Sequence, residues 1–480
     1  MSGPRLGDLL AEALPRDLPL NVRHVSTPPT RCDPLFSAAP GADPEVTFCE
    51  TNFLIVTLNR DSSKVDEEVA VCGFEVLVYT TKRLTTVFVS KADSTGNLRL
   101  IYDKHPAAKK GSLLRRIATT FLSFLVRTRR RPGVKTVLCL FARAQNQYLF
   151  PGSVENPGKH VLDDRGLVRW WCRVVDPILR EYDVELQGAA DGTQAEEKTD
   201  KSTKRTATAY LLVPGCDNYE TRAFFPPSAK FDAKDRLRWR VAYPLDRICA
   251  DVNVPPRCLI PRFPDDPKSR FLIDLDDELP DESSGNVPPG KAGQWRSVKS
   301  VDQFWEMMAF RQECSAGRVV GFLWVVIEPP SSEKSAQEGE QPTNSAFSWP
   351  EAGRGEVVLS ESDYKKAHSV LLEGDFETED AAVTGTMAWV RKVASLADIL
   401  WWGQAITGRK EELDEKPAEP IPAAGTVNTA LNVRKRKTDS ESSGEKPSDE
   451  TQPRTDPSHP MNNGGVNVLN GSIVRKKKKT

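Results

Sequence analysis

The chain has 480 residues, of which 39% are hydrophobic and 28% charged, and its formal net charge at neutral pH is −1. This length allows roughly three domains of ~150 residues, but several segments are too polar to pack, so we expect a smaller core. The balanced charge gives no global field that would attract nucleic acid, and we expect no sequence-specific nucleic-acid binding.

The nine cysteines and five histidines are scattered along the chain, and no two cysteines form a CxxC pair. This distribution argues against a zinc site, any other metal site and a secreted disulfide scaffold, and it favours a reducing compartment. The first fifteen residues lack the long apolar run of a signal peptide. We also find no run of ~20 apolar residues that would span a membrane. We therefore expect a soluble intracellular protein without membrane contacts.

In chain order, the first predicted element is a short amphipathic helix around residues 6–14, with a turn at 27–30. Residues 69–81 and 84–90 are rich in β-branched and aromatic side chains, and the tight connection between them predicts a β-hairpin. The second strand runs into residues 91–96, which we interpret as a polar loop at a strand end. Such loops often contact ligands, although most are simple turns.

A helix is predicted from Leu113, because apolar residues recur at helical spacing through Leu125, with Ser112 as its N-cap. Two lysines, a glycine and Ser112 at this helix start form either a phosphate-binding site or a basic exposed first turn. Residues 136–141 are predicted as a strand, and the loop after it, 143–151, is rich in amides and aromatics.

The next predicted helix follows Asp163 and carries two adjacent tryptophans, Trp170 and Trp171. Neighbouring side chains point about 100° apart on a helix. Both tryptophans therefore cannot share a narrow core seam. Either one of them lines a cleft, or both belong to a broad apolar face.

Further strands are predicted at 207–213 and 319–327, and helices at 300–310, 364–372 and 378–406, the last ended by Gly408. We expect one domain over residues 1–410. Segments about 188–206, 280–293 and 329–354 are expected to be disordered insertions, and residues 411–480 a disordered tail. The tail has basic clusters at 434–437 and 475–479. These clusters fit nuclear import, a grip on an acidic partner, or a solvated tail.

The motif at residues 262–271 places Asp265 and Asp266 between two prolines, with Lys268 close behind. Because proline restricts the residue before it, Asp266 is held in an extended or turn geometry. This geometry suits a reactive carboxylate. It equally suits an N-cap followed by Pro267 as the first residue of a helix through Phe271.

Four segments in order along the chain resemble one family: 88–96, 140–151, 159–160 with 170–171, and 263–271. They are similar to the fungal histone H3 lysine acetyltransferases of the regulator-of-transposition type. The resemblance implies an α/β fold, a central mixed sheet wrapped by helices, like that of the CBP-type acetyltransferases. It also implies acetyl-CoA as the donor, no metal, and acetylation of the αN-helix lysine and tail lysines of histone H3 on newly made H3–H4.

The same resemblance assigns roles to individual residues. Asp266 matches a carboxylate that donates or accepts a proton, Asp265 is its neighbour, and Lys268 matches a self-acetylated lysine. Asp93 and Trp171 match residues of the catalytic cleft, while Arg143 and Tyr148 are candidates for substrate contact. The positions that match acetyl-CoA contacts are Ala92, Asp93, Ser94, Ala108, Lys109, Lys110, Gly111, Ser112, Phe141, Gln145, His160, Val161, Leu162 and Trp170.

The chemistry fits these roles, because only about one lysine side chain in a thousand is neutral at pH 7 and a placed carboxylate can assist deprotonation. We expect Asp266 to accept the proton and Lys268 to tune it, unless Asp93 orients the substrate or no single residue is the base. We also expect Trp171→Ala to impair catalysis far more than folding.

The family implies a nuclear protein that acts in chromatin assembly, DNA replication and genome stability. Its implied partners are histone chaperones of the NAP family and of the anti-silencing-function type, although the loop at 127–131 is short here. Two other hypotheses stay open: a non-catalytic histone- or chromatin-binding scaffold, supported by the acidic stretch 274–282 and the tail, and an enzyme on another CoA or nucleotide substrate.

Overall fold

The structure, a computed structural model, describes residues 5–60, 67–105, 112–182, 206–234, 237–280, 293–311, 318–329, 347, 349 and 352–411. Contacts divide the chain into residues 1–416, to which all of these belong, and residues 417–480. The three predicted insertions lie almost entirely outside the described residues, as does the tail from residue 412 on.

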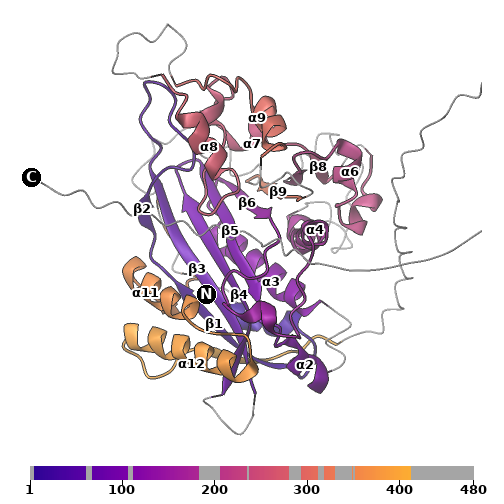
Figure 1. Ribbon diagram of the computed structural model, residues 1–480, viewed down its shortest axis with the longest axis vertical. Coiled ribbons are helices and arrows are strands. Elements are labelled where there is room, and N and C mark those ends of the chain that lie inside the picture. The colour runs from indigo at the N-terminus through magenta and orange to yellow at the C-terminus, as the bar shows by residue number, and fades with distance from the viewer. Residues whose placement is uncertain are drawn as a thin grey trace, which may run out of the picture. The chain divides into compact units, whose positions relative to one another are not determined.

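The described part of the chain is built on one mixed β-sheet of eleven strands (Figure 1). The strand order is β10-β1-β3-β4-β5-β6-β9-β7-β8, with β11 paired to β1 and β2 paired to β3. The pairs β1–β10, β5–β6 and β7–β8 are parallel, and the others are antiparallel. The prediction of an α/β fold with a central mixed sheet is therefore confirmed. The strands are β1 (Pro19–Ser26), β2 (Thr30–Cys32), β3 (Thr47–Asn59), β4 (Glu68–Thr80), β5 (Leu84–Ser94), β6 (Lys135–Ala142), β7 (Ala207–Leu212), β8 (Trp239–Val241), β9 (Gly321–Ile327), β10 (Val357–Val358) and β11 (Gln404–Thr407).

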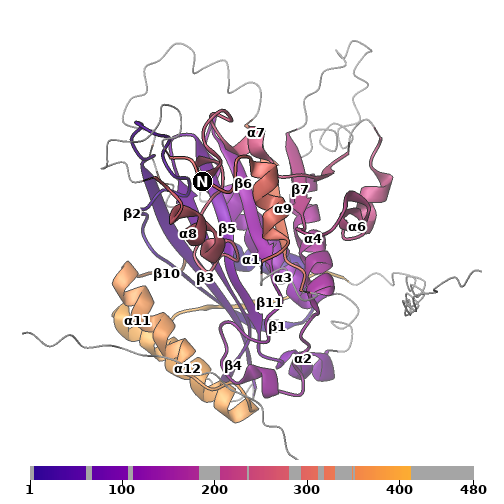
Figure 2. The same ribbon diagram turned by 45° about the horizontal axis from the view of Figure 1, so that its top comes forward.

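Helices cover both faces of this sheet (Figures 1 and 2). Alternate residues of β6 belong to different cores: Leu138 packs with α3 and α4, and Cys139 packs with α8 and α9. The helix α12 contacts β4, with α11 beside it. The helices are α1 (Leu6–Ala13), α2 (Leu98–Lys104), α3 (Leu113–Arg129), α4 (Asp164–Glu181), α6 (Asn218–Arg222), α7 (Leu245–Ile248), α8 (Ser269–Asp276), α9 (Val301–Met308), α11 (Glu361–Leu372) and α12 (Glu379–Leu396), with 3-10 turns at Ser153–Glu155, Pro227–Phe231 and Pro256–Cys258.

The predicted hairpin is confirmed as β4 and β5, which pair antiparallel with one irregularity. Val76 lies opposite Val89 and Glu75 opposite Lys91, so Ser90 is an extra residue that forms a β-bulge. The predicted polar loop at 91–96 is wrong in its first part, because β5 continues to Ser94. Backbone pairing with β4 holds these polar residues in an extended conformation.

Two other expectations need correction. The closing helix predicted through residue 406 ends at Leu396. Asp398 then adopts a left-handed φ of 54°, and Gln404–Thr407 forms β11 against β1. The sequence pattern also does not predict β1, β2 or β3, the last of which is a thirteen-residue strand.

Candidate active site

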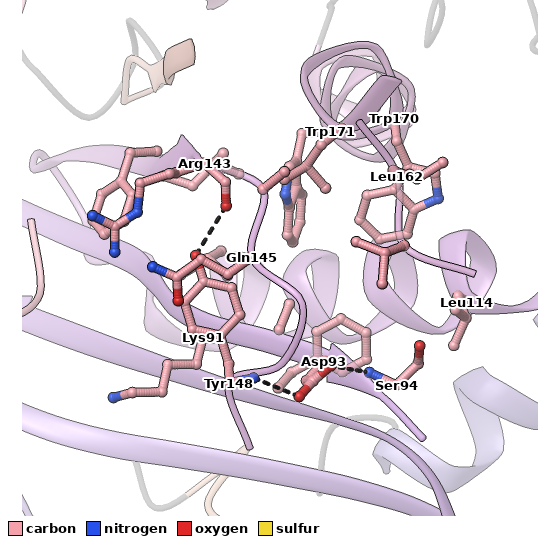
Figure 3. A pocket seen from close by; sticks show the side chains of 18 of the residues that line it. Lys91, Asp93, Ser94, Leu114, Arg143, Gln145, Tyr148, Leu162, Trp170 and Trp171 are labelled. Atoms are coloured by element: carbon pink, nitrogen blue, oxygen red, sulfur yellow. Dashed lines mark hydrogen bonds between the residues drawn. The ribbon is translucent and has the colours of Figure 1, made fainter. Parts of the chain in front are cut away.

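The candidate site lies where two neighbouring parallel strands separate. The β5–β6 register runs from Leu84 opposite Lys135 to Val89 opposite Leu140. Both strands continue beyond it, β5 to Ser94 and β6 to Ala142. A pocket opens at these diverging ends, closed on its other sides by α4, the start of α3 and the loops before α4 (Figure 3).

The pocket brings together most of the residues that the family resemblance singled out. All predicted acetyl-CoA contacts within residues 141–170 line it, as do Ala92, Asp93 and Ser94. The predicted substrate contacts Arg143 and Tyr148 also line it. Residues that the sequence did not single out complete the wall: Phe74, Val89, Ser90, Lys91, Leu114, Leu140, Ala144, Lys159 and Leu167. Spacing gave no signal for most of these, since they are ordinary strand or helix residues.

The predicted pyrophosphate segment is only partly described. Ser112 directly precedes α3 as predicted, but its side chain makes no capping hydrogen bond among the described residues. Leu114, in the first turn of α3, lines the pocket. Ala108, Lys109, Lys110 and Gly111 lie outside the described residues. The start of α3 therefore borders the pocket, where its first backbone N–H groups favour an anion.

The side chain of Asp93 is only 6% exposed, and its carboxylate is heavily hydrogen-bonded. Its Oδ2 accepts from the backbone N–H groups of residues 148, 149 and 150, at 2.7, 2.9 and 3.3 Å. Its Oδ1 accepts from the Ser94 N–H and from the Lys159 ammonium, both at 2.8 Å. An ionised carboxylate offers about four acceptor positions, so these five donors leave no free oxygen for a substrate. Asp93 therefore holds the loop backbone against β5.

Lys91 connects the pocket wall to a buried carboxylate on the other face of the sheet. Its ammonium points away from the tryptophan pair (Figure 3) and lies 2.9 Å from Glu75 Oε1 and 3.2 Å from Asp265 Oδ2. Burial lowers the pKa of Lys91, but Glu75 and Asp265 outweigh burial and raise it overall. Ser90 Oγ and the Tyr364 hydroxyl also donate to Glu75, at 2.9 and 2.7 Å. Lys91 thus remains a cation that fixes β5.

Tyr148 closes one side of the pocket. Its hydroxyl donates to the backbone carbonyl of Arg143 at 2.9 Å, which holds the loop between them in a compact turn. Burial raises the pKa of Tyr148 above its ordinary value, although Arg143 acts in the opposite direction. The phenol therefore stays neutral at pH 7 and serves as a hydrogen-bond donor.

The two tryptophans both line the pocket from α4 (Figure 3). Their ring centres are 4.8 Å apart in an edge-to-face arrangement. Trp171 is only 5% exposed and belongs to the core, while Trp170 is half-buried. The two interpretations of the pair are thus compatible, because Trp171 serves as both core and pocket wall.

The carboxylates of the 262–271 motif do not line the pocket. Asp265 has a left-handed φ of 53° and an exposed side chain that reaches Lys91. Asp266 is turned inward: its Oδ1 accepts from the Lys268 N–H at 2.9 Å, and its Oδ2 forms an ion pair with the Lys268 ammonium. The side chains of Asp266 and Lys268 are 0% and 3% exposed.

The predicted N-cap at Asp266 is wrong by two residues. The helix α8 begins at Ser269, with Lys268 at the cap position. The reason is local: the Asp266 side chain bonds the backbone N–H two residues on, which makes a turn ahead of the helix. Pro267 lies inside this turn.

Within the described residues, no group of three or more His, Cys, Asp or Glu side chains is arranged to hold a metal ion.

None of the described helices is both long and apolar enough to cross a membrane.

Comparison with known proteins identifies the family. The sequence model of the histone acetyltransferase KAT11-type domain matches residues 6–135 and 130–392. The chain is 47% identical to histone acetyltransferase rtt109 of Aspergillus flavus over 99% of both chains. It is 31% identical to histone acetyltransferase rtt109 of Schizosaccharomyces pombe over 67% of this chain and 71% of that one.

A solved structure agrees with these sequence matches. The crystal structure of Rtt109 from Aspergillus fumigatus superposes with a TM-score of 0.76 at 55% identity, covering 85% of this chain and all of the other. The chain therefore belongs to the Rtt109 family of KAT11-type histone acetyltransferases.

Proposed function

We propose that this histone acetyltransferase transfers the acetyl group of acetyl-CoA to lysines of histone H3, in the αN helix and in the tail, on newly made H3–H4. The observation that carries the proposal is the pocket at the diverging ends of β5 and β6, which combines apolar walls with a few placed polar groups. Pockets for small cofactors usually have this composition.

The donor fits the pocket in two parts. The apolar walls from Leu140, Leu162 and Leu167 suit the pantetheine chain, and the amide of Gln145 and the ring of His160 offer hydrogen bonds. The pyrophosphate is assigned to the start of α3, at Ser112 and at residues 108–111, which the family resemblance singles out. Backbone N–H groups at a helix start favour phosphate. Acetyl-CoA supplies an activated acyl group as a thioester.

The acceptor lysine is assigned to the side of the pocket formed by Arg143, Tyr148 and the tryptophan pair. An indole face packs well against the methylene stem of a lysine and favours a nearby cation. In the reaction the lysine ammonium gives up two protons, one to the base and one to the departing sulfur. Its nitrogen forms an amide bond to the acetyl carbon, while the carbon–sulfur bond breaks and CoA leaves as the thiol. Tyr148 and Trp171 orient the reacting nitrogen.

Proton removal is assigned to Asp266, under control of Lys268. In the described state Asp266 is fully enclosed and paired with that lysine, so a substrate does not reach its oxygens. Acetylation of Lys268 removes the positive charge. The pair then loses its charge–charge attraction, and Asp266 becomes available as an acceptor, directly or through a water molecule.

We further propose that the enzyme acts in the nucleus, in chromatin assembly, DNA replication and genome stability. Its acetyltransferase domain is assigned to residues 1–410, with a basic tail from 411 to 480. Histone chaperones of the NAP family and of the anti-silencing-function type are the expected partners.

The decisive experiment measures acetyl transfer from acetyl-CoA to purified H3–H4, with and without these chaperones, and maps the modified lysines by mass spectrometry. A scaffold without catalytic function would bind H3–H4 but neither bind acetyl-CoA nor transfer acetyl. Asp266 is tested separately with the pH–rate profile of Asp266→Asn. If kcat/KM of this variant stays near wild type across the acidic limb, Asp266 is not the base.

A further inference from the structure

Lys159 is a cation built into the wall of the pocket. Its side chain is only 4% exposed. Its ammonium donates to Asp93 Oδ1 at 2.8 Å and to Ser153 Oγ at 2.7 Å. Lysine is almost never fully buried unless it is paired, because desolvating an ammonium is costly. The two acceptors around Lys159 therefore define a specific place for this charge.

The backbone at Lys159 is fixed as firmly as its side chain. The Lys159 N–H donates to the Asn156 carbonyl at 2.9 Å. Asn156 Oδ1 accepts from the Gly158 N–H at 2.9 Å, and its amide donates to Asn97 at 3.2 Å. This turn lies directly on Gly96, where a Cβ would be 2.6 Å from the Lys159 nitrogen. A glycine with φ of +88° at residue 96 permits this close approach.

The Asp93–Lys159 ion pair joins three segments that each line the pocket. Asp93 is at the end of β5, and its Oδ2 holds the backbone from Tyr148 to Phe150. Lys159 immediately precedes the wall residues His160, Val161 and Leu162. Without the ammonium, the Oδ1 of Asp93 would keep only the Ser94 N–H as a donor. A buried carboxylate in that state would draw in water or shift the segments around it.

We propose that Lys159 is a positioning residue for acetyl transfer. Through Asp93 it sets the distance between the loop that ends at Tyr148 and the 160–162 segment, and so it sets the shape of the channel for the acetyl donor. This inference rests on the proposed assignment of acetyl-CoA to this pocket. It predicts an effect on donor binding and no direct effect on histone binding, since Lys159 is part of the wall of the proposed donor pocket and its side chain is only 4% exposed.

The test compares Lys159→Met, which keeps the length of the side chain and removes its charge, with wild type. Donor affinity is measured by calorimetry with acetyl-CoA, and KM is measured for acetyl-CoA and for H3–H4. We expect acetyl-CoA to bind about tenfold or more weakly, because small displacements of positioning groups have effects of this size. The KM for H3–H4 should stay within twofold of wild type. The matched control is Lys365→Met, which removes an exposed lysine paired with Glu361 and should leave both substrates unaffected.

A double-mutant cycle with Asp93→Asn tests whether Lys159 acts through Asp93. In Asp93→Asn alone, a neutral amide faces the Lys159 ammonium, and the charge–charge attraction between the two side chains is lost. In Asp93→Asn/Lys159→Met neither partner is charged. We expect the loss of donor affinity in the double variant to be smaller than the product of the two single losses, because contacting residues are coupled. Independent, multiplicative losses would show that Lys159 does not act through Asp93.

The remaining outcomes separate this inference from the pocket assignment. If Lys159→Met binds acetyl-CoA within twofold of wild type while Leu162→Arg abolishes binding, the pocket stands and the positioning role is wrong. If Leu162→Arg also leaves binding unchanged, the assignment of the pocket is wrong and the inference falls with it. Equal losses for both substrates, together with a lower Tm, would indicate a general structural role and overturn the proposal.

Should Lys159→Met not fold, Ser153→Ala replaces it as the test, since this change removes one acceptor of the ammonium and no charge. A smaller loss of acetyl-CoA affinity in the same direction is then expected. Unchanged affinity in Ser153→Ala would refute the positioning role in that case.

Discussion

The buried pair Asp266–Lys268 gives a quantitative prediction about Lys268→Met. The carboxylate is 0% exposed and the lysine side chain 3% exposed. The ammonium also lies 5.2 Å from the ring centre of Phe322 and 5.9 Å from that of Phe263. Removing one partner of a buried ion pair leaves the other charge uncompensated, at a cost of about 3–5 kcal/mol. That is a large part of a typical unfolding free energy of about 5–15 kcal/mol.

The double variant Asp266→Asn/Lys268→Met should recover much of this loss, because replacing both partners of a buried pair is often nearly neutral. Urea unfolding at pH 7, followed by circular dichroism, measures both variants. Lys366→Met, an exposed lysine paired with Asp363, is the matched control and should change stability by less than about 0.5 kcal/mol. A loss below about 1 kcal/mol for Lys268→Met, or a larger loss in the double variant, would refute the reasoning from burial.

Acetylation of Lys268 resembles the methionine variant only in part. The charge is lost in both, but acetyl-lysine keeps one N–H that can still donate to Asp266. The acetylated protein should therefore lie between wild type and Lys268→Met in its urea midpoint. This intermediate stability is the physical basis on which the modification can free Asp266 without unfolding α8.

Three further predictions concern the pocket and the sheet. Trp171→Ala should lose about 3–5 kcal/mol of stability as well as activity, because the residue is core; this replaces the expectation from the sequence that catalysis would suffer far more than folding. Half-buried Trp170→Ala should chiefly weaken acetyl-CoA binding, and equal urea midpoints for the two variants would contradict this contrast. Burial lowers the pKa of His24 from 6.5 to about 4. The unfolded chain therefore binds the proton first as pH falls from 6.5 to 4, which removes about 3 kcal/mol of stability; His24→Gln should flatten this part of the curve of unfolding free energy against pH. Burial raises the pKa of Glu75, but Lys91, His368 and Tyr364 together outweigh burial and hold the pKa below 4.5. The stability that Glu75 contributes is thus present above pH 4.5 and lost below it, so Lys91→Met should destabilise the protein more at pH 7 than at pH 3.

The sequence predicted those elements whose signal is local. In the hairpin of β4 and β5, apolar residues stand in runs or at alternate positions over much of each strand. In α3, apolar residues recur at helical spacing, at Leu113, Ile117, Phe121 and Leu125. The spacing of the apolar residues within each element then decides which of its faces packs against the core. For this reason the sheet centre and the helix that borders the pocket were predictable from composition and spacing alone.

Elements that depend on distant partners could not be predicted in this way. The strand β1 buries Arg23 because Glu68, forty-five residues later, binds its guanidinium, and it buries His24 beside Asn52. A single sequence shows such residues only as polar interruptions. The four residues of β11 pair with β1. Apolar residues at helical spacing over 383–400 made the chain up to residue 406 look like a continuation of α12.

The residues of the site divide in the same way, into those with a local sequence signal and those whose roles depend on distant partners. Motif resemblance found many of the residues that line the pocket, but their roles depend on neighbours far along the chain. Asp93 looks like a free carboxylate in a polar loop, whereas its partners lie 55 to 66 residues later. Lys159 lies in a matched motif beside His160, but the resemblance assigns a role to His160 and none to Lys159. Only the folded geometry shows that it is the buried partner of Asp93.

The pocket itself follows from one inserted residue. Parallel pairing between β5 and β6 ends at Val89, and the bulge is the next residue, Ser90. A bulge bends its strand and increases the local twist, so β5 turns away from β6 where the pocket opens. Glu75 accepts from Ser90, the bulged residue, and from Lys91, the residue after it. A buried carboxylate on the far face of the sheet thereby stabilises the bend, and the separation of the strands that opens the proposed donor pocket depends on a charge that does not line it.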